Sequence, residues 1–114
     1  MKRSTAYVPD RGAIVYLEFD PTIGREQRGH RPGFVLSPRS YNQKTSLALV
    51  MPITKQQKGY AFEVLLPDGL KTQGVILSDQ IKCVDWRARN VQFVEAVPEE
   101  VIEEVQAKIT ALLL

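Results

Sequence analysis

Residues 12–19 read Gly-Ala-Ile-Val-Tyr-Leu-Glu-Phe, and this short stretch indicates the class of architecture. β-Branched and aromatic side chains favour extended backbone. The cluster Asp-Pro-Thr-Ile-Gly at residues 20–24 is typical of a turn. The sequence therefore predicts a β-strand over residues 12–19 that ends in a connecting loop.

Six further segments downstream carry similar strand signals. Residues 46–53 are apolar on both faces, which is typical of a central strand. Pro32 and Pro38 bracket another segment, which we place at 33–37 because a proline inside a strand loses a ladder hydrogen bond. The close spacing predicts a curled antiparallel sheet or small barrel. The six segments are 33–37, 46–53, 60–66, 74–78, 81–86 and 91–97.

The last part of the chain changes to a helical period. Pro98 suits the start of a helix, and Glu99 and Glu100 favour its positive end. The apolar residues then fall on one stripe, which predicts an amphipathic helix packed on the sheet. We therefore expect one mostly-β domain over residues 1–114, a small antiparallel barrel with a C-terminal α-helix. The stripe comprises Val101, Ile102, Val105, Ile109, Leu112 and Leu113.

The composition is that of an ordinary globular chain. Of its 114 residues 44% are hydrophobic and 25% charged, which fits one domain. The longest apolar runs have five residues, too few for a membrane span or an export signal. Cys83 is the only cysteine, so no internal disulfide can form, and we expect a cytoplasmic protein whose lone thiol packs as a small apolar group.

Charge is distributed unevenly along the chain. Residues 1–60 hold ten Lys or Arg against four acids, whereas residues 61–114 hold five against nine. A polyanion such as nucleic acid would meet the first half, although a solvated face explains most such imbalances. The single histidine, His30, excludes a mechanism that uses two imidazoles in one subunit.

The loop at residues 24–32 is the most informative segment for chemistry. It carries five ionisable side chains, among them Glu26 and Arg31. Thr54 ends another predicted strand and precedes Lys55 and Lys58. If the two loops meet, a phosphate would find cations, a hydroxyl and a carboxylate together; the alternative is a solvated polar loop. Cysteine and histidine are too few for zinc, no tight acidic cluster suggests magnesium, and Pro9-Asp10 is only a weak metal-nuclease pattern. No cofactor or metal is expected.

Short blocks spread along the chain resemble the signature of the MazF/PemK toxins, the mRNA interferases of type II toxin–antitoxin systems. No block is decisive alone, but they occur in the family's order over essentially the whole chain. The blocks are Val8-Pro-Asp10, Gly12, Phe19-Asp-Pro-Thr22, Gly24, Glu26-Gln27, Gly29-His-Arg-Pro32, Val35-Leu-Ser37, Pro52-Ile-Thr54, Lys58-Gly-Tyr60, Phe62-Glu-Val64, Gly74, Asp79-Gln-Ile-Lys82 and Asp85-Trp-Arg-Ala-Arg89.

The resemblance implies an SH3-like barrel that assembles as a homodimer and cuts single-stranded RNA without a metal. The ribose 2′-hydroxyl attacks the neighbouring phosphorus and leaves a 2′,3′-cyclic phosphate and a 5′-hydroxyl. Glu26 matches the family's proposed general base, Arg31 its essential arginine, and Thr54 its strand-end threonine. Without the family, Thr54 would be interpreted as a strand residue that caps its own backbone.

Other residues are candidates for holding the RNA. Asp20 is expected to orient the loop, and His30 either approaches the phosphate or packs beside the arginine. Trp86 is expected in the core or a dimer contact. The family also implies an acidic antitoxin as partner. The remaining RNA-binding candidates are Phe19, Thr22, Gln27, Ser37, Lys55, Lys58 and Gln80.

Two other functions stay open. CcdB toxins share the implied fold but poison gyrase through a tryptophan near the C-terminus, whereas this chain ends Ala-Leu-Leu-Leu. The second alternative is a barrel that binds RNA without cutting it.

Overall fold

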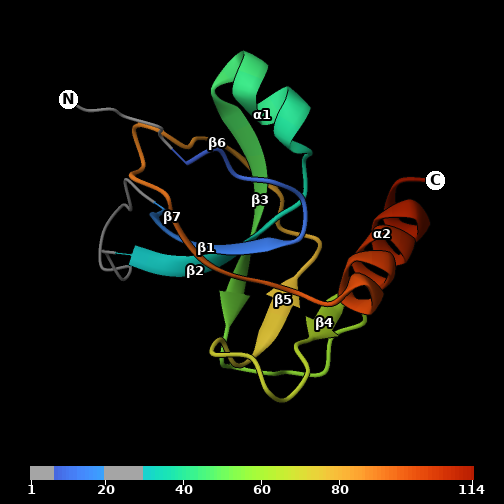
Figure 1. Cartoon of the computed structure of the whole chain (residues 1–114). Helices are drawn as coiled ribbons and strands as arrows, with labels where there is room; N and C mark the ends of the chain where they lie inside the picture. The colour runs from blue at the N-terminus through green and yellow to red at the C-terminus, as the bar shows by residue number, and fades with distance from the viewer. Residues whose placement is uncertain (1–6, 20–29) are drawn as a thin grey trace, which may run out of the picture.

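The computed structural model describes residues 7–19 and 30–114, with only the backbone described at His30 (Figure 1). Strands dominate the described part, and a longer helix follows them. The elements are β1 (Ala13–Glu18), β2 (His30–Val35), α1 (Arg39–Thr45), β3 (Leu47–Thr54), β4 (Glu63–Leu65), β5 (Val75–Leu77), β6 (Lys82–Asp85), β7 (Gln92–Ala96) and α2 (Glu99–Leu113).

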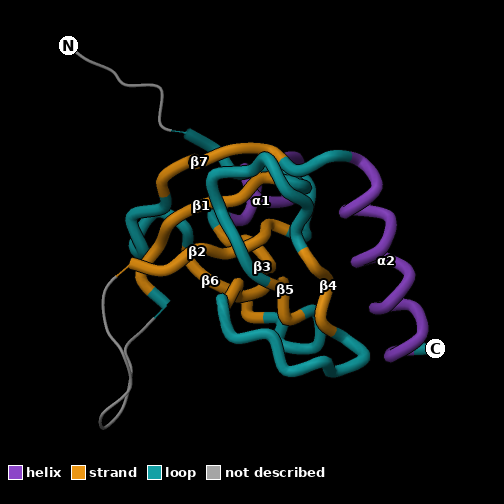
Figure 2. The backbone as a smooth tube through the Cα atoms, turned by 90° about the horizontal axis from the view of Figure 1, so that it is seen from below, coloured by secondary structure: helices purple, strands orange, loops and turns teal. Residues whose placement is uncertain are grey.

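The described strands form one sheet in the order β4-β5-β3-β2-β1-β7, with β6 also paired to β3. Every pairing is antiparallel, as the strand spacing predicts. Helix α2 lies along one side of this sheet next to β4 (Figure 2). The mostly-β architecture with a C-terminal helix is confirmed.

Strand β3 is the centre of the sheet and lies between β2 and β5. Its ladder to β2 ends at Gly33↔Pro52, while its last residues, Ile53 and Thr54, pair with β5 on the opposite edge. The exclusion of Pro32 from the strand was wrong, because β2 begins at His30 and Pro32 lies opposite Tyr16 of β1. No ladder to β3 is interrupted at Pro32, since that ladder has already ended.

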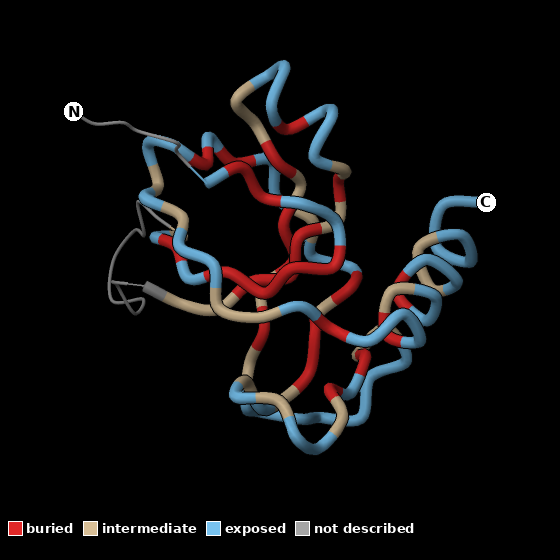
Figure 3. Tube along the Cα trace, in the orientation of Figure 1, coloured by how far each residue is buried: buried red, intermediate tan, exposed pale blue. Residues whose placement is uncertain are grey.

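Apolar side chains form two buried clusters on both faces of the strands, and the buried positions follow the strands (Figure 3). One cluster lies beneath α2, where Val101 and Val105 pack with Phe34 and Ile76. The other includes Val15, Val50 and Trp86. Burial on both sides explains why the strand at 46–53 lacks a polar face, since each fully buried aliphatic side chain contributes roughly 1.5–3 kcal/mol.

Helix α1 is absent from the sequence prediction because its segment, Arg-Ser-Tyr-Asn-Gln-Lys-Thr, has no apolar period. Its one buried side chain, Asn42, accepts a hydrogen bond from the Ser37 hydroxyl (2.6 Å) and donates to the Pro9 carbonyl (2.8 Å) and the Ser37 carbonyl (3.1 Å). The indole of Trp86 donates to the Asn42 carbonyl (2.9 Å). We call Ser37, Asn42 and Trp86 the Asn42 cluster. It ties α1 to the segments on both sides of it.

Two sequence expectations about single residues have opposite outcomes. Trp86 is 3% exposed, so its place in the core is confirmed. Cys83 is exposed, so the expectation of a packed thiol was wrong; it lies in β6, where only Val84 is buried. Across residues 7–19 and 30–114, neither helix is long and apolar enough to cross a membrane.

Candidate active site

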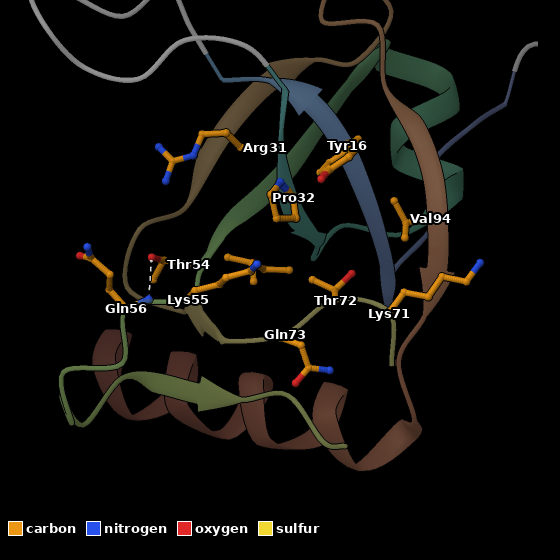
Figure 4. A pocket seen from close by; sticks show the side chains of 11 residues that line it. Tyr16, Arg31, Pro32, Thr54, Lys55, Gln56, Lys71, Thr72, Gln73 and Val94 are labelled. Carbon is orange, nitrogen blue, oxygen red and sulfur yellow. Dashed lines mark hydrogen bonds between the residues drawn. The ribbon is translucent and has the colours of Figure 1, made fainter. Parts of the chain in front are cut away.

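A groove of about 720 Å³ opens where strands β1, β2, β3 and β7 meet two connections of the chain (Figure 4). The connection after β3 supplies residues 55 and 56, and the connection between β4 and β5 supplies residues 71–73. The lining residues are Tyr16, Arg31, Pro32, Ile53, Thr54, Lys55, Gln56, Lys71, Thr72, Gln73 and Val94.

Arg31, Thr54 and Lys55 line this groove together, although 23 positions or more separate Arg31 from the other two. Arg31 comes from β2 and Thr54 from the end of β3, neighbouring strands in the sheet. The Thr54 hydroxyl accepts a hydrogen bond from the backbone N–H of Gln56 (3.1 Å). The local cap predicted from sequence is thus present. A hydroxyl that accepts one bond still carries a hydrogen that can be donated to a ligand oxygen.

The charge of the groove favours an anion. Its lining includes Arg31, Lys55 and Lys71, and no carboxylate occurs among the described lining residues. A guanidinium presents its donors in a planar fork that matches two phosphate oxygens. The arrangement can therefore bind a phosphate and stabilise extra negative charge on it.

Four of the predicted site residues lie outside the described residues. These are Asp20, Thr22, Glu26 and Gln27. The backbone of His30 pairs with Glu18 at the start of β2. The roles assigned to these five side chains remain predictions.

Four other RNA-binding candidates do not line the groove. Phe19 packs against the second core cluster, with the Lys82 ammonium 5.7 Å from its ring centre. Ser37 is buried, and its hydroxyl bonds to Asn42 and accepts from the N–H of Leu49 (2.8 Å). Lys58 lies further along the connection after β3, and Gln80 lies in the connection between β5 and β6; both are exposed. Ser37 thus has a structural partner for each of its hydrogen-bonding functions.

The groove also contains residues that the sequence reasoning missed. Tyr16 is 45% exposed and stands between buried Val15 and Leu17 in β1. Residues 13–17 are apolar or aromatic throughout, so the exposure of Tyr16 could not be predicted from polar alternation. Lys71, Thr72 and Gln73 carried no signal either, because they belong to a connection whose position depends on the whole fold.

Glu95 of β7 holds this second connection in place. Its carboxylate accepts hydrogen bonds from the backbone N–H of Lys71 (3.0 Å) and of Thr72 (2.8 Å). Partial burial alone would raise the pKa of Glu95, but these hydrogen bonds, with help from the Thr72 hydroxyl and the Lys71 charge, lower that pKa below its ordinary value. The carboxylate therefore stays ionised and bonded at neutral pH.

The described residues include no group of three or more His, Cys, Asp or Glu placed to hold a metal ion. Asp10, the residue of the weak metal-nuclease pattern, has another role. Its carboxylate accepts hydrogen bonds from the backbone N–H groups of Arg11 and Arg39 (2.8 Å each). The bond from Arg39 caps the start of α1 from a distant segment.

The fold and the groove define a small antiparallel β protein with a basic groove at the ends of its central strands. Comparisons with known proteins refine this class. Residues 10–113 match the family described as PemK-like, MazF-like toxin of type II toxin–antitoxin system. The chain therefore belongs to the PemK/MazF toxin family.

Individual relatives agree with that assignment. The chain is 49% identical over 107 residues to the endoribonuclease toxin MazF of Escherichia coli K12, covering 94% of this chain and 96% of the relative. A crystal structure of MazF from Deinococcus radiodurans superposes with a TM-score of 0.87 at 45% identity, covering 95% of this chain and 98% of that one. A MazE–MazF crystal structure from the same organism gives a TM-score of 0.86 at 44% identity, covering 94% and 97%.

Proposed function

We propose that this chain is the toxin of a type II toxin–antitoxin system and that it cleaves single-stranded RNA, including mRNA, in the groove at the ends of β2 and β3. The observation that carries the proposal is the meeting of Arg31, Thr54 and Lys55 around one basic groove in a member of this family. The relative from E. coli bears the name of an endoribonuclease toxin.

The reaction needs no outside nucleophile. The ribose 2′-oxygen bonds to the adjacent phosphorus as the bond from phosphorus to the 5′-oxygen breaks. A general base accepts the 2′-hydroxyl proton, and the departing 5′-oxygen gains a proton. The products are a 2′,3′-cyclic phosphate and a 5′-hydroxyl.

The protein supplies positioning and charge to this reaction. Arg31 grips two phosphate oxygens and stabilises the negative charge that grows on them, while the Thr54 hydroxyl donates to a non-bridging oxygen. Glu26 accepts the 2′-hydroxyl proton; a free glutamate has a pKa of about 4.3 and is ionised at neutral pH. The proposal requires no metal ion, because the guanidinium serves as the charge stabiliser.

The same groove suits the partners that the family implies. A basic surface that binds RNA also attracts an acidic peptide, such as the tail of an antitoxin. A MazE–MazF complex has been crystallised for the D. radiodurans relative. We therefore include a homodimeric toxin, an acidic antitoxin and a cytoplasmic location in the proposal.

Cleavage of a long single-stranded RNA in the presence of excess chelator tests this function. We expect cutting to persist in chelator, with 5′-hydroxyl and cyclic phosphate ends at a short repeated sequence. The same strand with a 2′-deoxyribose at the scissile position should bind and remain intact. Cutting that stops in chelator would contradict the metal-free mechanism.

Binding without cutting would instead identify a passive RNA-binding barrel. Inhibition of gyrase by a protein that leaves RNA intact would favour the CcdB-like alternative. Mapping the 5′ ends of the fragments reveals the recognised sequence in the same experiment.

A further inference from the structure

The groove extends well beyond the neighbourhood of Arg31. Arg31 stands at one end, and Lys71 extends from the opposite end beneath Val94, with Tyr16 and Thr72 between them (Figure 4). A single phosphate bound at Arg31 would leave the Lys71 end empty. A chain of three or more nucleotides could reach both cations.

Tyr16, which lies between the two cations, offers a surface on which a base can stack. It lies opposite Pro32 of β2 and Gln92 of β7 on the ladders that flank β1, and nearly half of its side chain is exposed. An exposed aromatic ring on a strand is a typical platform for an unpaired base, because every base can stack on it.

Two features of β7 fix the far end of the groove. Ile14 pairs with Glu95 and Val15 pairs with Phe93, so Val94 is the extra residue of a β-bulge. In a regular strand Val94 and Glu95 would point to opposite faces. Here Val94 lines the groove, while Glu95 reaches the backbone of Lys71 and Thr72 at the same end.

The connection that carries Lys71 is also anchored at its root. The N–H of Leu66 donates to the carbonyl of Gly74 (3.0 Å), which closes the loop between β4 and β5. Within the loop, the Gln73 amide donates to the Leu70 carbonyl (2.9 Å). These bonds and the two to Glu95 hold the backbone at Lys71 beside the groove, so little backbone ordering is needed when a ligand binds.

We propose that Tyr16 and Lys71 form a second nucleotide subsite, in which Tyr16 stacks on the base of a nucleotide next to the two that flank the scissile linkage and Lys71 contacts that nucleotide's phosphate, with Glu95 as a positioning residue. This subsite rests on the proposed function in that it takes the groove's ligand to be single-stranded RNA. It adds affinity for RNA longer than the two nucleotides that flank the cut.

Affinity for an uncleavable RNA, with 2′-deoxyribose at the scissile position, tests the subsite directly. We expect Tyr16→Ala to weaken binding about tenfold, because base–aromatic stacking contributes on that scale, and Tyr16→Phe to restore it. Lys71→Ala should weaken binding several-fold and reduce the salt dependence by about one released counterion. Both variants should raise KM far more than they lower kcat.

RNA length and Glu95 supply the independent readouts. The defects of Tyr16→Ala and Lys71→Ala should disappear with a dinucleotide, which cannot reach from Arg31 to Lys71. Glu95→Gln should reproduce the Lys71→Ala defect at neutral pH, and Glu95→Asp should recover part of it. A merely structural role for Glu95 would lower the melting temperature without this dependence on RNA length.

Matched controls lie elsewhere on the surface. Tyr60 is 65% exposed and does not line the groove, so Tyr60→Ala controls for Tyr16. Lys44 of α1 controls for Lys71. Asp85, whose carboxylate accepts from the N–H groups of Arg87 (3.1 Å) and Ala88 (3.0 Å), controls for Glu95 through Asp85→Asn.

The outcomes separate the subsite from the reaction. If the native protein cuts RNA while Tyr16→Ala and Lys71→Ala bind long RNA with native affinity, the subsite is refuted and the proposed function stands. If the native protein binds but never cuts, and these variants weaken binding with the stated length dependence, the subsite stands and the proposed activity fails. Equal weakening by the control variants would also refute the subsite.

Discussion

The groove and the Asn42 cluster are both rich in polar groups, yet those groups have different partners. In the cluster, the side chains of Ser37 and Asn42 bond to one another and to nearby backbone, and the cluster is sealed from solvent. In the groove, Arg31, Lys55 and Lys71 gather around a partly open space. Polar groups that satisfy one another hold a fold together, whereas cations gathered around an open space are suited to an anionic ligand.

This difference explains why residues of two consecutive family blocks have different roles. Ser37 is only six positions from Arg31, and both belong to segments that resemble the toxin signature. The structure places Ser37 among buried hydrogen bonds and Arg31 in the groove. A family signature thus combines residues that maintain the fold, such as Ser37, with residues that line the groove, such as Arg31.

Replacing Arg31 should have the largest effect and should fall on activity alone. We expect Arg31→Ala to lower kcat about 100- to 1000-fold, since losing one preorganised charge stabiliser costs about 3–4 kcal/mol in the transition state. Arg31→Lys should recover only part of this, because lysine lacks the planar fork. Single-turnover cleavage of labelled RNA measures the loss, and the melting temperature should stay within a few degrees. Native activity in Arg31→Ala would refute the assigned site.

Replacing Asn42 should have the reverse profile. Asn42→Ala leaves the Ser37 hydroxyl and the Pro9 carbonyl buried without their partner, which should cost about 2–4 kcal/mol of unfolding free energy. Urea denaturation measures this cost, and cleavage by the folded fraction should remain near native. The exposed neighbour Gln43, changed to alanine, is the control and should lose less than about 0.5 kcal/mol. Equal stability of the two variants would show that the cluster contributes nothing.

Lowering the pH should remove the stability that Glu95 contributes beside the groove but not that of the Asn42 cluster. This effect should be smaller than those of the two substitutions above. The hydrogen bonds that lower the pKa of Glu95 favour its ionised form in the folded protein. The resulting stability is fully present above the unfolded value of about 4.5 and is lost as the pH falls through the lower folded value. We therefore expect the difference in unfolding free energy between the native protein and Glu95→Gln to shrink below about pH 4.5. A difference that is the same at pH 7 and pH 3 would contradict this role of Glu95, and Asn42→Ala should show no such trend.

Most of the sheet could be predicted from the sequence because its signals are local. Alternation, turn clusters and the change of period at Pro98 located seven strands and α2. The errors occurred where distant segments override local preference. Helix α1 has no apolar stripe, and its start is capped by Asp10 from another part of the chain. Strand β2 tolerates Pro32 because its ladder to β3 ends at Gly33.

The candidate site was predictable only in part for the same reason. Arg31, Thr54 and Lys55 stood out by residue type and position at strand ends, and they do line one groove. Tyr16 was not selected, because its neighbours at residues 13–15 and 17 are all apolar and nothing in the sequence marks it as exposed. The placement of Lys71 depends on Glu95, 24 positions further along the chain, and on a bulge in β7. Contacts of that range leave no periodic signal in the sequence.

Gly74 lies where the loop that carries Lys71 packs against Thr54, at the end of β3. Its φ of +120° is unfavourable for other residues, and a Cβ there would overlap the Thr54 carbonyl. The root of the loop is therefore fixed against the strand end, while the exposed positions 68, 69 and 71 face solvent. Those outer positions can therefore vary without displacing Thr54, so this loop is a natural place to alter the affinity of the proposed subsite for RNA.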